Sequence, residues 1–404
     1  MYPVSLGGCE LIVGGTLQMN RTKLEIISGT GTLNVLYGGT VNVNDASEGI
    51  AFRIGGNVTI AGQVLLSNPS TGVSIARPMN CTIAEGGALS IINPSSTALF
   101  NGGNLSVHGD LTISNGPAGI DQLIGAVSNL TVGASGNVTV VNVDGTGINA
   151  TNVTNDGELS VIGASVGVDL QNTRSFTNRG EVNVTNNDVQ VQGGSIVTED
   201  QSEVNVAGVA NSQMFTFGGG TSFSPGSSPG CAVFTDAMDF SGMNLLFELE
   251  GLIFCQEYDR IQLLAGVTLT GTTLTLAGGF VPSPGSIFRI MDIGGDSGNR
   301  TGEFTGLPEG SVIDFNGVPL TLTYVGGDGN DIELSTSAVL PAILSTWRGE
   351  VDKDHNRMEW STLSEVGFSH FTLERRDPGS SNWLSLATIP GQNLGAAAGA
   401  GLGN

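Results

Sequence analysis

The chain has 404 residues and a formal net charge of −23, and glycine supplies 62 of its residues. Because only 14 residues are basic, the sequence offers no basic surface to neutralise the phosphates of nucleic acid or to bind an anionic membrane. The apolar fraction of 39% argues against wholesale disorder, and the glycines lack the three-residue period of collagen. No apolar run is long enough to predict a transmembrane segment.

A short phrase recurs through the first half of the chain. It consists of Gly, a small or polar residue, Val or Leu, a polar residue and a second apolar residue, and its copies start at Gly15, Gly39, Gly62, Gly87, Gly109, Gly136, Gly157, Gly180 and Ser202. Successive starts differ by 24, 23, 25, 22, 27, 21, 23 and 22 residues. A second phrase follows the same rhythm, as in residues 56–60 and 103–107, so each repeat contains at least two short strands.

One repeat is too short to enclose a core by itself. Alternate side chains of a strand share a face, so the two apolar residues of each phrase point the same way, and stacked repeats can bury them together. Glycine and asparagine before each strand tolerate left-handed backbone angles and allow sharp turns. We therefore predict that residues 1–212 form a right-handed parallel β-helix with about 23 residues per turn. The alternative, an array of β-sandwiches, requires regular hairpin turns that the sequence lacks.

The composition changes at Met214, and two Pro-Gly turns follow at residues 225–226 and 229–230. Residues 213–337 are predicted to form a β-rich extension with longer strands at 244–250, 259–264, 267–277, 287–293, 320–325 and 332–335. Cys231 and Cys255 fall in this segment, where a disulfide between neighbouring strands and two free buried thiols are both open.

Residues 338–391 show three strand patterns and two spaced tryptophans, Trp347 and Trp360, which suit the first half of a β-sandwich. Residues 392–404 are rich in Gly and Ala, so we predict a disordered tail.

Several phrases of this second half resemble known secreted proteins. Residues 224–230, 257–261, 269–274, 302–308 and 324–331 resemble bacterial passenger proteins with β-helical repeats, of the autotransporter-adhesin type. Residues 339–389 resemble the fibronectin-III-like or immunoglobulin-like module near the C-terminus of Bacteroidetes proteins exported by type IX secretion. The resemblance implies an extracellular or outer cell-surface location. Neither a signal peptide nor a sorting domain is visible in this sequence, so we expect a truncated piece of a longer protein.

A β-helix can also carry a polysaccharide lyase or glycoside hydrolase, whose chemistry needs clustered carboxylates. Two clusters are predicted from the sequence, one of Asp156 and Glu158 near Glu181, and one of Glu199 and Asp200 with Glu203. No Arg or Lys accompanies these acids at a repeated position. Because the acids are spread at one or two per turn, we interpret them as solvated charges that keep the rod soluble, and we predict no catalysis.

The run 326–331 resembles a single calcium-binding nonapeptide repeat, with Asp328 and Asp331 as the ligands that calcium would use. Glu333 stands where an apolar residue is expected, so we favour a glycine-rich hairpin turn and predict no cofactor. Asp259 and Arg260 are predicted to be a surface pair, and His355 and His370 to be structural.

These features favour a secreted or cell-surface protein of structural or adhesin type. The solenoid would serve as a stiff spacer and as a broad surface for weak contacts with glycans, with proteins of neighbouring cells or with itself. A polysaccharide-degrading β-helix and a component of a cell-surface layer are the alternatives.

Overall fold

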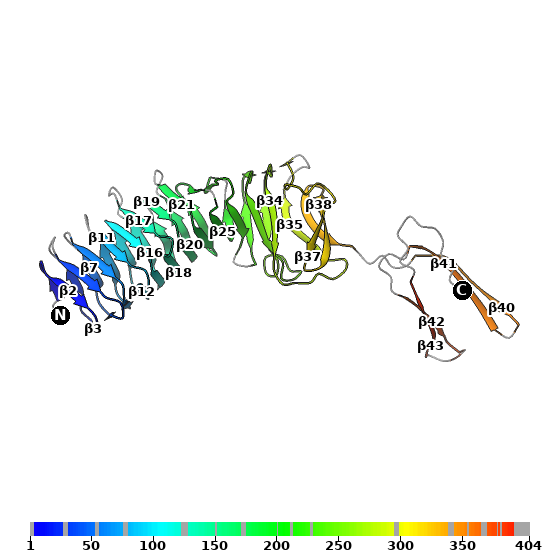
Figure 1. Cartoon of the computed structure of the whole chain (residues 1–404), viewed down its shortest axis with the longest axis horizontal. Coiled ribbons are helices and arrows are strands. Elements are labelled where there is room, and N and C mark those ends of the chain that lie inside the picture. Colours follow the sequence, from blue (N-terminus) through cyan, green and yellow to red (C-terminus); the bar gives the residue numbers. More distant parts are fainter. Residues whose placement is uncertain are drawn as a thin grey trace.

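The computed structural model describes residues 4–26, 31–52, 56–75, 80–122, 128–149, 152–170, 175–199, 201–210, 213–226, 229–294, 299–337, 343–353, 355–364, 370–377, 379 and 382–391. Within these residues every element is a β-strand. The strands stack into an elongated rod, and β40 to β43 lie outside it (Figure 1). Asp200 and the predicted disordered tail, 392–404, lie outside the described residues.

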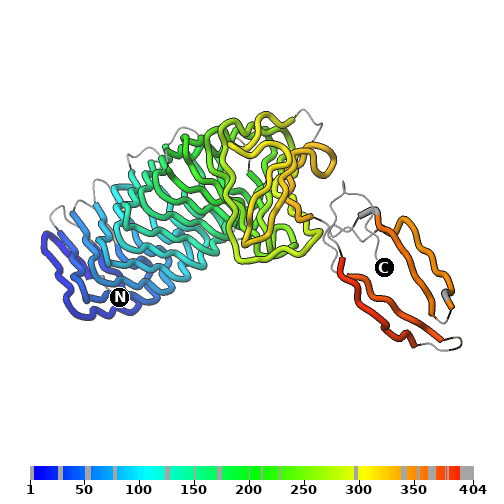
Figure 2. The backbone as a smooth tube through the Cα atoms, turned by 45° about the vertical axis from the view of Figure 1, so that its right-hand side comes forward, coloured from blue at the N-terminus to red at the C-terminus, as the bar shows by residue number. Residues whose placement is uncertain are grey.

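The rod is a three-sided parallel solenoid, and the path of its turns can be followed in Figure 2. Face 1 consists of β2 (Glu10–Val13), β5 (Thr32–Val35), β8 (Asn57–Ile60), β11 (Asn80–Ile83), β14 (Asn104–Val107), β17 (Asn129–Val132), β19 (Asn152–Asn155), β21 (Ser175–Asn178), β24 (Ile196–Thr198) and β27 (Phe215–Thr216).

Face 2 follows face 1 in every turn. It consists of β3 (Thr16–Asn20), β6 (Thr40–Asn44), β9 (Gln63–Ser67), β12 (Ala88–Ile92), β15 (Asp110–Gly116), β18 (Asn137–Asn149), β20 (Glu158–Asp169), β22 (Glu181–Thr185), β25 (Glu203–Val206), β28 (Ser222–Pro225), β31 (Asn244–Glu248) and β34 (Thr273–Ala277).

Face 3 closes the turn. It consists of β1 (Val4–Leu6), β4 (Leu24–Ile26), β7 (Glu48–Phe52), β10 (Thr71–Ile75), β13 (Thr97–Asn101), β16 (Ala118–Gln122), the second halves of β18 and β20, and β23 (Val189–Gln192). β18 and β20 each run around a corner, which joins faces 2 and 3 into one sheet.

The repeat period of the sequence is the length of one turn. The residues that follow the phrase starts stand in one line across face 2: Thr16, Thr40, Gln63, Ala88, Asp110, Asn137, Glu158, Glu181 and Glu203. All these pairings are parallel, so the predicted all-β parallel solenoid of about 23 residues per turn is confirmed. The hand of the coil stays a prediction.

The core is a continuous column of aliphatic side chains. In the turn that contains β5, β6 and β7, the side chains of Leu33, Val41 and Ile50 are buried, one from each face. The polar residues between the apolar ones, such as Asn34 and Asn42, stay partly exposed. Each turn therefore buries its apolar residues against those of the next turn, as expected for units that cannot fold alone.

The phrase glycines are required by close stacking and not by unusual backbone angles. Gly62 and Gly109 are absent from the residues with positive φ. A Cβ atom on Gly109 would instead collide with the carbonyl oxygens of Ala84 and Gly87 in the preceding turn. The expected left-handed glycines before the strands occur one residue earlier, at Gly38 and Gly86, whereas the phrase glycines themselves are constrained by the neighbouring turn.

Asparagine and aspartate residues with left-handed backbone angles gather at a different corner, where face 2 passes into face 3. One residue per turn takes a φ between 50° and 56° there, at Asp45, Asn68, Asn93, Asn115 and Asn142. Asparagine and aspartate adopt this conformation more readily than most other non-glycine residues. The predicted role of asparagine in sharp turns therefore holds at this corner.

Replacing Gly109 by Ala should destabilise the solenoid, because the added methyl group forces adjacent turns apart. A loss of about 1–3 kcal/mol in the free energy of unfolding is expected from overpacking, measured by urea denaturation. Gly15 occupies the equivalent position of the first repeat and has no described atom within 4 Å of an added Cβ, so Gly15→Ala is the matched control. Equal stability of the two variants would contradict the stacking argument.

Parallel pairing continues past residue 212, where the sequence places a domain boundary. Face 2 extends through β28, β31 and β34, while β26 (Gly208–Ala210), β29 (Cys231–Phe234), β32 (Arg260–Leu263) and β35 (Ile287–Ile293) pair in parallel beside it. A short third ladder contains β30 (Met238–Asp239), β33 (Val267–Thr268) and β36 (Arg300–Thr301). The strand predicted over 267–277 is thus split between two faces, with Gly271 at a φ of 74° in the corner.

The direction of pairing reverses at the end of the rod. β35 pairs antiparallel with β39 (Asp331–Thr336), which pairs with β38 (Val318–Gly326), and β38 pairs with β37 (Val312–Phe315). Phenylalanines enter the core in this part of the rod. Phe223 packs against Phe234 and Phe240 with ring centroids 5.8 and 5.6 Å away.

A disulfide and a buried carboxylate stabilise the junction around the Pro-Gly turns. Cys231 and Cys255 form a disulfide, with their Cα atoms 4.9 Å apart. The fully buried Asp259 accepts hydrogen bonds from the backbone N–H of Gly230 at 2.6 Å and of Glu248 at 2.8 Å. Burial raises the pKa of Asp259 from 3.8 to about 7. The prediction of a surface pair with Arg260 is wrong, because Asp259 faces backbone donors inside the fold and Arg260 pairs with Asp292.

Stability should depend on pH through Asp259. Because its pKa is higher in the folded chain, the folded state binds a proton that the unfolded state has already released between pH 3.8 and about 7. The free energy of unfolding is therefore expected to contain a component that falls as pH rises through this window. Denaturant titrations at several pH values should show this component in the wild type and not in Asp259→Asn. The exposed Asp236→Asn is the control and should keep the wild-type slope; an unchanged slope in Asp259→Asn would contradict the assignment.

The last described strands form two antiparallel hairpins. β40 (Ile343–Asp352) pairs with β41 (His355–Ser364), and β42 (His370–Arg375) pairs with β43 (Leu384–Pro390). The ring of Trp360 lies 6.1 Å from Trp347 and 5.8 Å from Phe371, so the hairpins touch. Two separate two-stranded sheets do not establish a fibronectin-III-like sandwich, which stays a proposal.

Candidate functional site

Face 1 carries a row of five asparagines that stand one above the other on consecutive turns: Asn57, Asn80, Asn104, Asn129 and Asn152. Each amide from the second onward donates from Nδ2 to Oδ1 of the asparagine before it, over 3.1, 2.8, 2.8 and 3.4 Å. Ser175 extends the row by donating to Asn152 at 3.2 Å. The row exists because parallel strands in register place the same repeat position on one line along the solenoid.

A second row of hydroxyl residues runs beside the first, two residues further along each strand. Its members are Thr59, Thr82, Ser106, Thr131 and Thr154, and all are partly exposed. The residues between the two rows, such as Val58 and Leu105, point into the core. We call these two rows the Asn/Thr face; over the turns from Asn57 to Thr131 they line a shallow depression.

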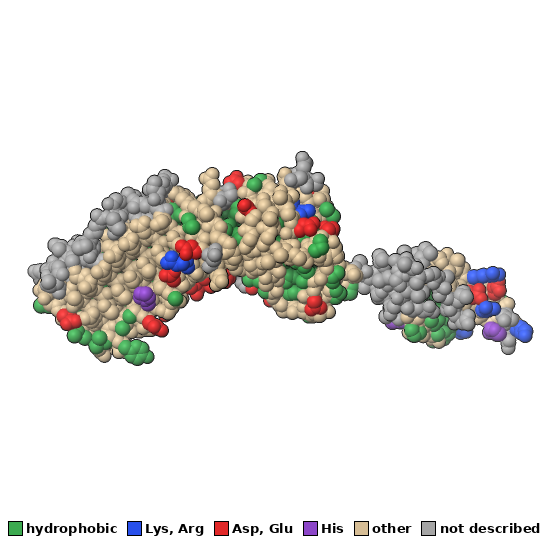
Figure 3. All heavy atoms as spheres, turned by 45° about the horizontal axis from the view of Figure 1, so that its top comes forward, with side chains coloured by type: hydrophobic (Ala, Val, Ile, Leu, Met, Phe, Trp, Pro, Cys, Tyr) green, Lys and Arg blue, Asp and Glu red, His purple; other side chains and the backbone are tan. Residues whose placement is uncertain are grey.

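The Asn/Thr face offers hydrogen bonds without charge. An asparagine amide has two N–H donors and an oxygen with two lone pairs, so a single bond to each neighbour leaves capacity for a ligand. None of the residues that line the depression is ionisable. The space-filling view shows a broad uncharged area on the rod, drawn in tan, with histidine and charged side chains near its border (Figure 3).

An exposed aromatic side chain stands at the corner between faces 1 and 2. Tyr37 is 87% exposed, and Leu36 beside it is 47% exposed. The Tyr37 ring reaches along the corner toward Gly86, where a Cβ atom would lie 4.0 Å from its Cε2 atom. Apolar side chains left this open on a rod with a well-filled core are a feature of interaction surfaces.

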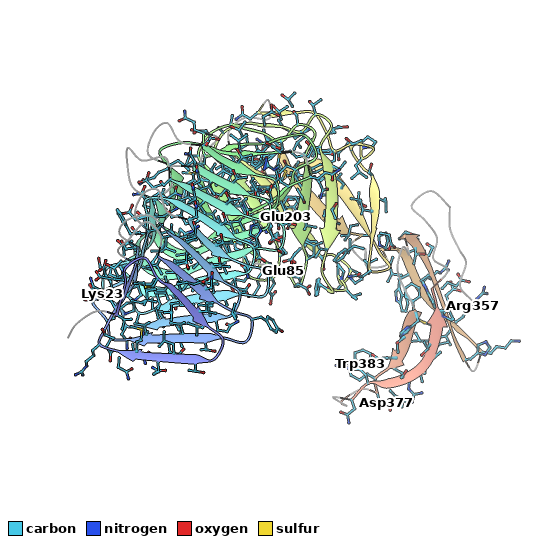
Figure 4. The ribbon with its side chains drawn as sticks, turned by 60° about the vertical axis from the view of Figure 1, so that its left-hand side comes forward. Lys23, Glu85, Glu203, Arg357, Asp377 and Trp383 are labelled. Atoms are coloured by element: carbon cyan, nitrogen blue, oxygen red, sulfur yellow. A yellow bond between two sulfur atoms is a disulfide. The ribbon has the colours of Figure 1, made fainter. Side chains whose placement is uncertain are left out.

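Face 2 carries a row of acids on three consecutive turns. Glu158, Glu181 and Glu203 pair in register, which places their backbones about 4.8 Å apart. They line a groove of about 460 Å³ together with Glu248 and polar residues such as Asn183. Burial and the charge of Glu181 raise the pKa of Glu203. Figure 4 labels Glu203 in this row and Glu85 on an earlier turn.

A basic residue joins two other acids in a separate row. Arg179 contacts Asp156 on the preceding turn, with Nε 2.7 Å from Oδ1, and Glu199 on the following turn, with Nη1 3.7 Å from Oε1. The predicted proximity of Glu158 to Glu181 is confirmed. Asp156 and Glu199, which were predicted to cluster with Glu158 and Glu203, instead contact Arg179, a residue that the prediction lacked. These acids separate because a corner lies between them, at Gly157 in the first case. The signal that could have found both rows is the spacing of one turn, 158 to 181 to 203 and 156 to 179 to 199.

The two residues named for calcium lie in and beside the turn between β38 and β39. Asp331 is buried, and its carboxylate contacts Arg289 Nη1 at 3.0 Å and accepts from the Ile293 N–H at 2.8 Å. Asp328 is exposed in the turn. The favoured glycine-rich hairpin is what the structure has here. Across the described ranges no group of three or more His, Cys, Asp or Glu residues is placed to hold a metal ion, and calcium at Asp328 and Asp331 stays the untested alternative.

No family model matches the chain, and no curated protein matches it. The resemblance to adhesin-type passenger proteins and to type IX-secreted modules therefore rests on the quoted phrases alone. In the described part of the chain no helix is long and apolar enough to cross a membrane.

Proposed function

We propose that the protein is an extracellular or cell-surface scaffold of structural or adhesin type, with a stiff solenoid that presents the Asn/Thr face to a repetitive partner. The observation that carries this proposal is the uncharged row of five asparagines, which repeats one binding unit on every turn.

The packing of the rod supports the role of spacer. Backbone hydrogen bonds and a continuous apolar core join each turn to the next, and the asparagine row adds side-chain bonds on the surface. Bending such a rod would break contacts on several faces at once. A rigid surface also keeps its binding units at constant spacing, so weak contacts can add up without a further ordering cost.

The location outside the cytosol is supported by cysteine chemistry. A disulfide such as Cys231–Cys255 persists in oxidising compartments, and glutathione and thioredoxin keep such thiols reduced in most cytosols. The phrases that resemble secreted bacterial proteins point the same way.

A second function is favoured by the glutamate row. Retaining glycosidases use two carboxylates about 5–5.5 Å apart, and Glu181 and Glu203 follow each other on neighbouring turns whose backbones lie about 4.8 Å apart. The pKa of Glu203 is raised beside Glu181, and a carboxyl group with a raised pKa can act as a general acid. A polysaccharide-degrading solenoid is therefore the competing proposal, with Glu203 as the general acid and Glu181 as the second carboxylate.

The scaffold proposal predicts adhesion that depends on the Asn/Thr face. The protein should sediment with bacterial cell envelopes, and Asn104→Arg should reduce the bound fraction at least about fivefold, because a long cationic side chain interrupts the row. Asn183→Arg places the same side chain on face 2, away from the Asn/Thr face, and should bind like wild type. Absence of sedimentation with any envelope preparation would contradict the proposal.

The enzyme proposal makes a separate prediction. Acidic and neutral polysaccharides are incubated with the protein, with and without calcium, and the release of reducing or unsaturated ends is measured. On the scaffold proposal no release above the blank is expected. Release that Glu181→Gln abolishes and the exposed control Glu85→Gln preserves would replace the scaffold by the enzyme.

A further inference from the structure

We infer that the Asn/Thr face binds a single extended chain of an uncharged polysaccharide, which lies along the axis of the solenoid and stacks a sugar ring on Tyr37. The inference rests on the proposed function and names the ligand of that same surface.

Charge selects against an ionic ligand. The protein has a formal net charge of −23, yet no ionisable residue lines the depression on the Asn/Thr face. A polyanion would be repelled by the field of the whole molecule, and a polycation would be drawn to the acids elsewhere, such as the glutamate row of face 2. The ligand that this surface suits is therefore neutral.

The hydrogen-bonding groups suit a polyhydroxyl chain. The two rows run parallel to the solenoid axis and are two residues apart on each strand, or about 6.6 Å. Amides border the depression on one side and hydroxyl groups on the other, and each group both donates and accepts hydrogen bonds. A sugar polymer carries hydroxyl groups along both of its edges, so it can bond to both rows on successive turns.

The geometry disfavours a protein partner. The well-packed centre of a protein interface is apolar and contains buried anchors. On the Asn/Thr face the apolar residues between the rows are turned inward, as the 2% exposure of Val58 shows, and the depression is shallow. Contact at one turn is consequently weak, and affinity has to come from the number of turns engaged.

Tyr37 lies outside the residues that line the depression, at the corner where face 1 ends, and offers the apolar contact that the rows lack. Its ring is open to solvent at the corner and is directed along the axis toward Gly86, which has no side chain to obstruct it. The carbon-bound hydrogens of a sugar ring can pack on the negative face of an aromatic ring, while the hydroxyl groups stay free for the rows.

The test is affinity electrophoresis of the whole chain in native gels that contain a soluble β-glucan, an α-glucan, a galactomannan or, as the acidic probe, polygalacturonate. Retardation is expected with at least one neutral polymer and not with polygalacturonate, and it should persist at high salt. Ser106→Arg should weaken retardation about tenfold or more, and Tyr37→Ala by a smaller factor of about threefold.

Thr112→Arg is the matched control, because Thr112 is a partly exposed hydroxyl residue in the same turn as Ser106 but on face 2. It should be retarded like wild type, and circular dichroism melts should confirm that all three variants fold. Retardation only by polygalacturonate, by none of the polymers, or equally for Ser106→Arg and wild type would overturn the inference. If binding to cell envelopes persists in those cases and still depends on Asn104, the ligand assignment fails and the scaffold stands; if that binding is also absent, both fail.

Discussion

The whole structure depends on one constraint, which is that each turn must lie on the next in register, about 4.8 Å away, through parallel strand pairing. This distance decides which residues are tolerated where. A Cβ atom on Gly109 meets the carbonyl oxygens of the turn before it, which explains why most copies of the phrase begin with glycine. Aliphatic residues such as Val41 and Val64 stack into one column, so the core grows with every turn and no turn is stable alone.

The same constraint turns single surface residues into rows, and the energetic result depends on their chemistry. Asparagines stacked at this spacing satisfy one another through amide hydrogen bonds, as in the row from Asn57 to Asn152. Glutamates at the same spacing repel, which contributes to the raised pKa of Glu203. In the third case Arg179 stands between Asp156 and Glu199 and offsets their charges. Surface composition in a solenoid is therefore selected along the axis more than along the chain.

The C-terminal part of the rod departs from this regularity. Larger phenylalanines replace Val and Leu in the core near Phe223, and strand pairing turns antiparallel after β35. The antiparallel strands β39, β38 and β37 cover an edge that a further parallel turn would otherwise occupy, which removes unpaired backbone groups from that side of the sheet. Asp259 and the Cys231–Cys255 disulfide tie the long loop before β32 to this part of the core.

Much of the fold could be predicted from the sequence, because in a parallel solenoid the repeat period of the sequence equals the length of one turn. The spacing of the phrases set the turn length, the strand class and the line Thr16, Thr40, Gln63 across face 2. The third strand of each turn was missed, since face 3 residues such as 48–52 lack the phrase. The split of 267–277 was also missed, because its corner is marked only by Gly271.

The sequence by itself determined that the chain coils in parallel turns, since alternation and a constant period leave few other ways to bury the apolar residues. The turn length also predicted that Glu158 lies near Glu181, but only the tertiary structure decided which neighbouring acids are separated. Glu158 and Glu181 are 23 residues apart and adjacent in space, while Asp156 and Glu158 are neighbours in the chain that the corner at Gly157 sends to different rows. Contacts across turns depend on where each corner falls, and a corner such as the one at Gly157 also depends on close packing against the preceding turn, which the local sequence does not show.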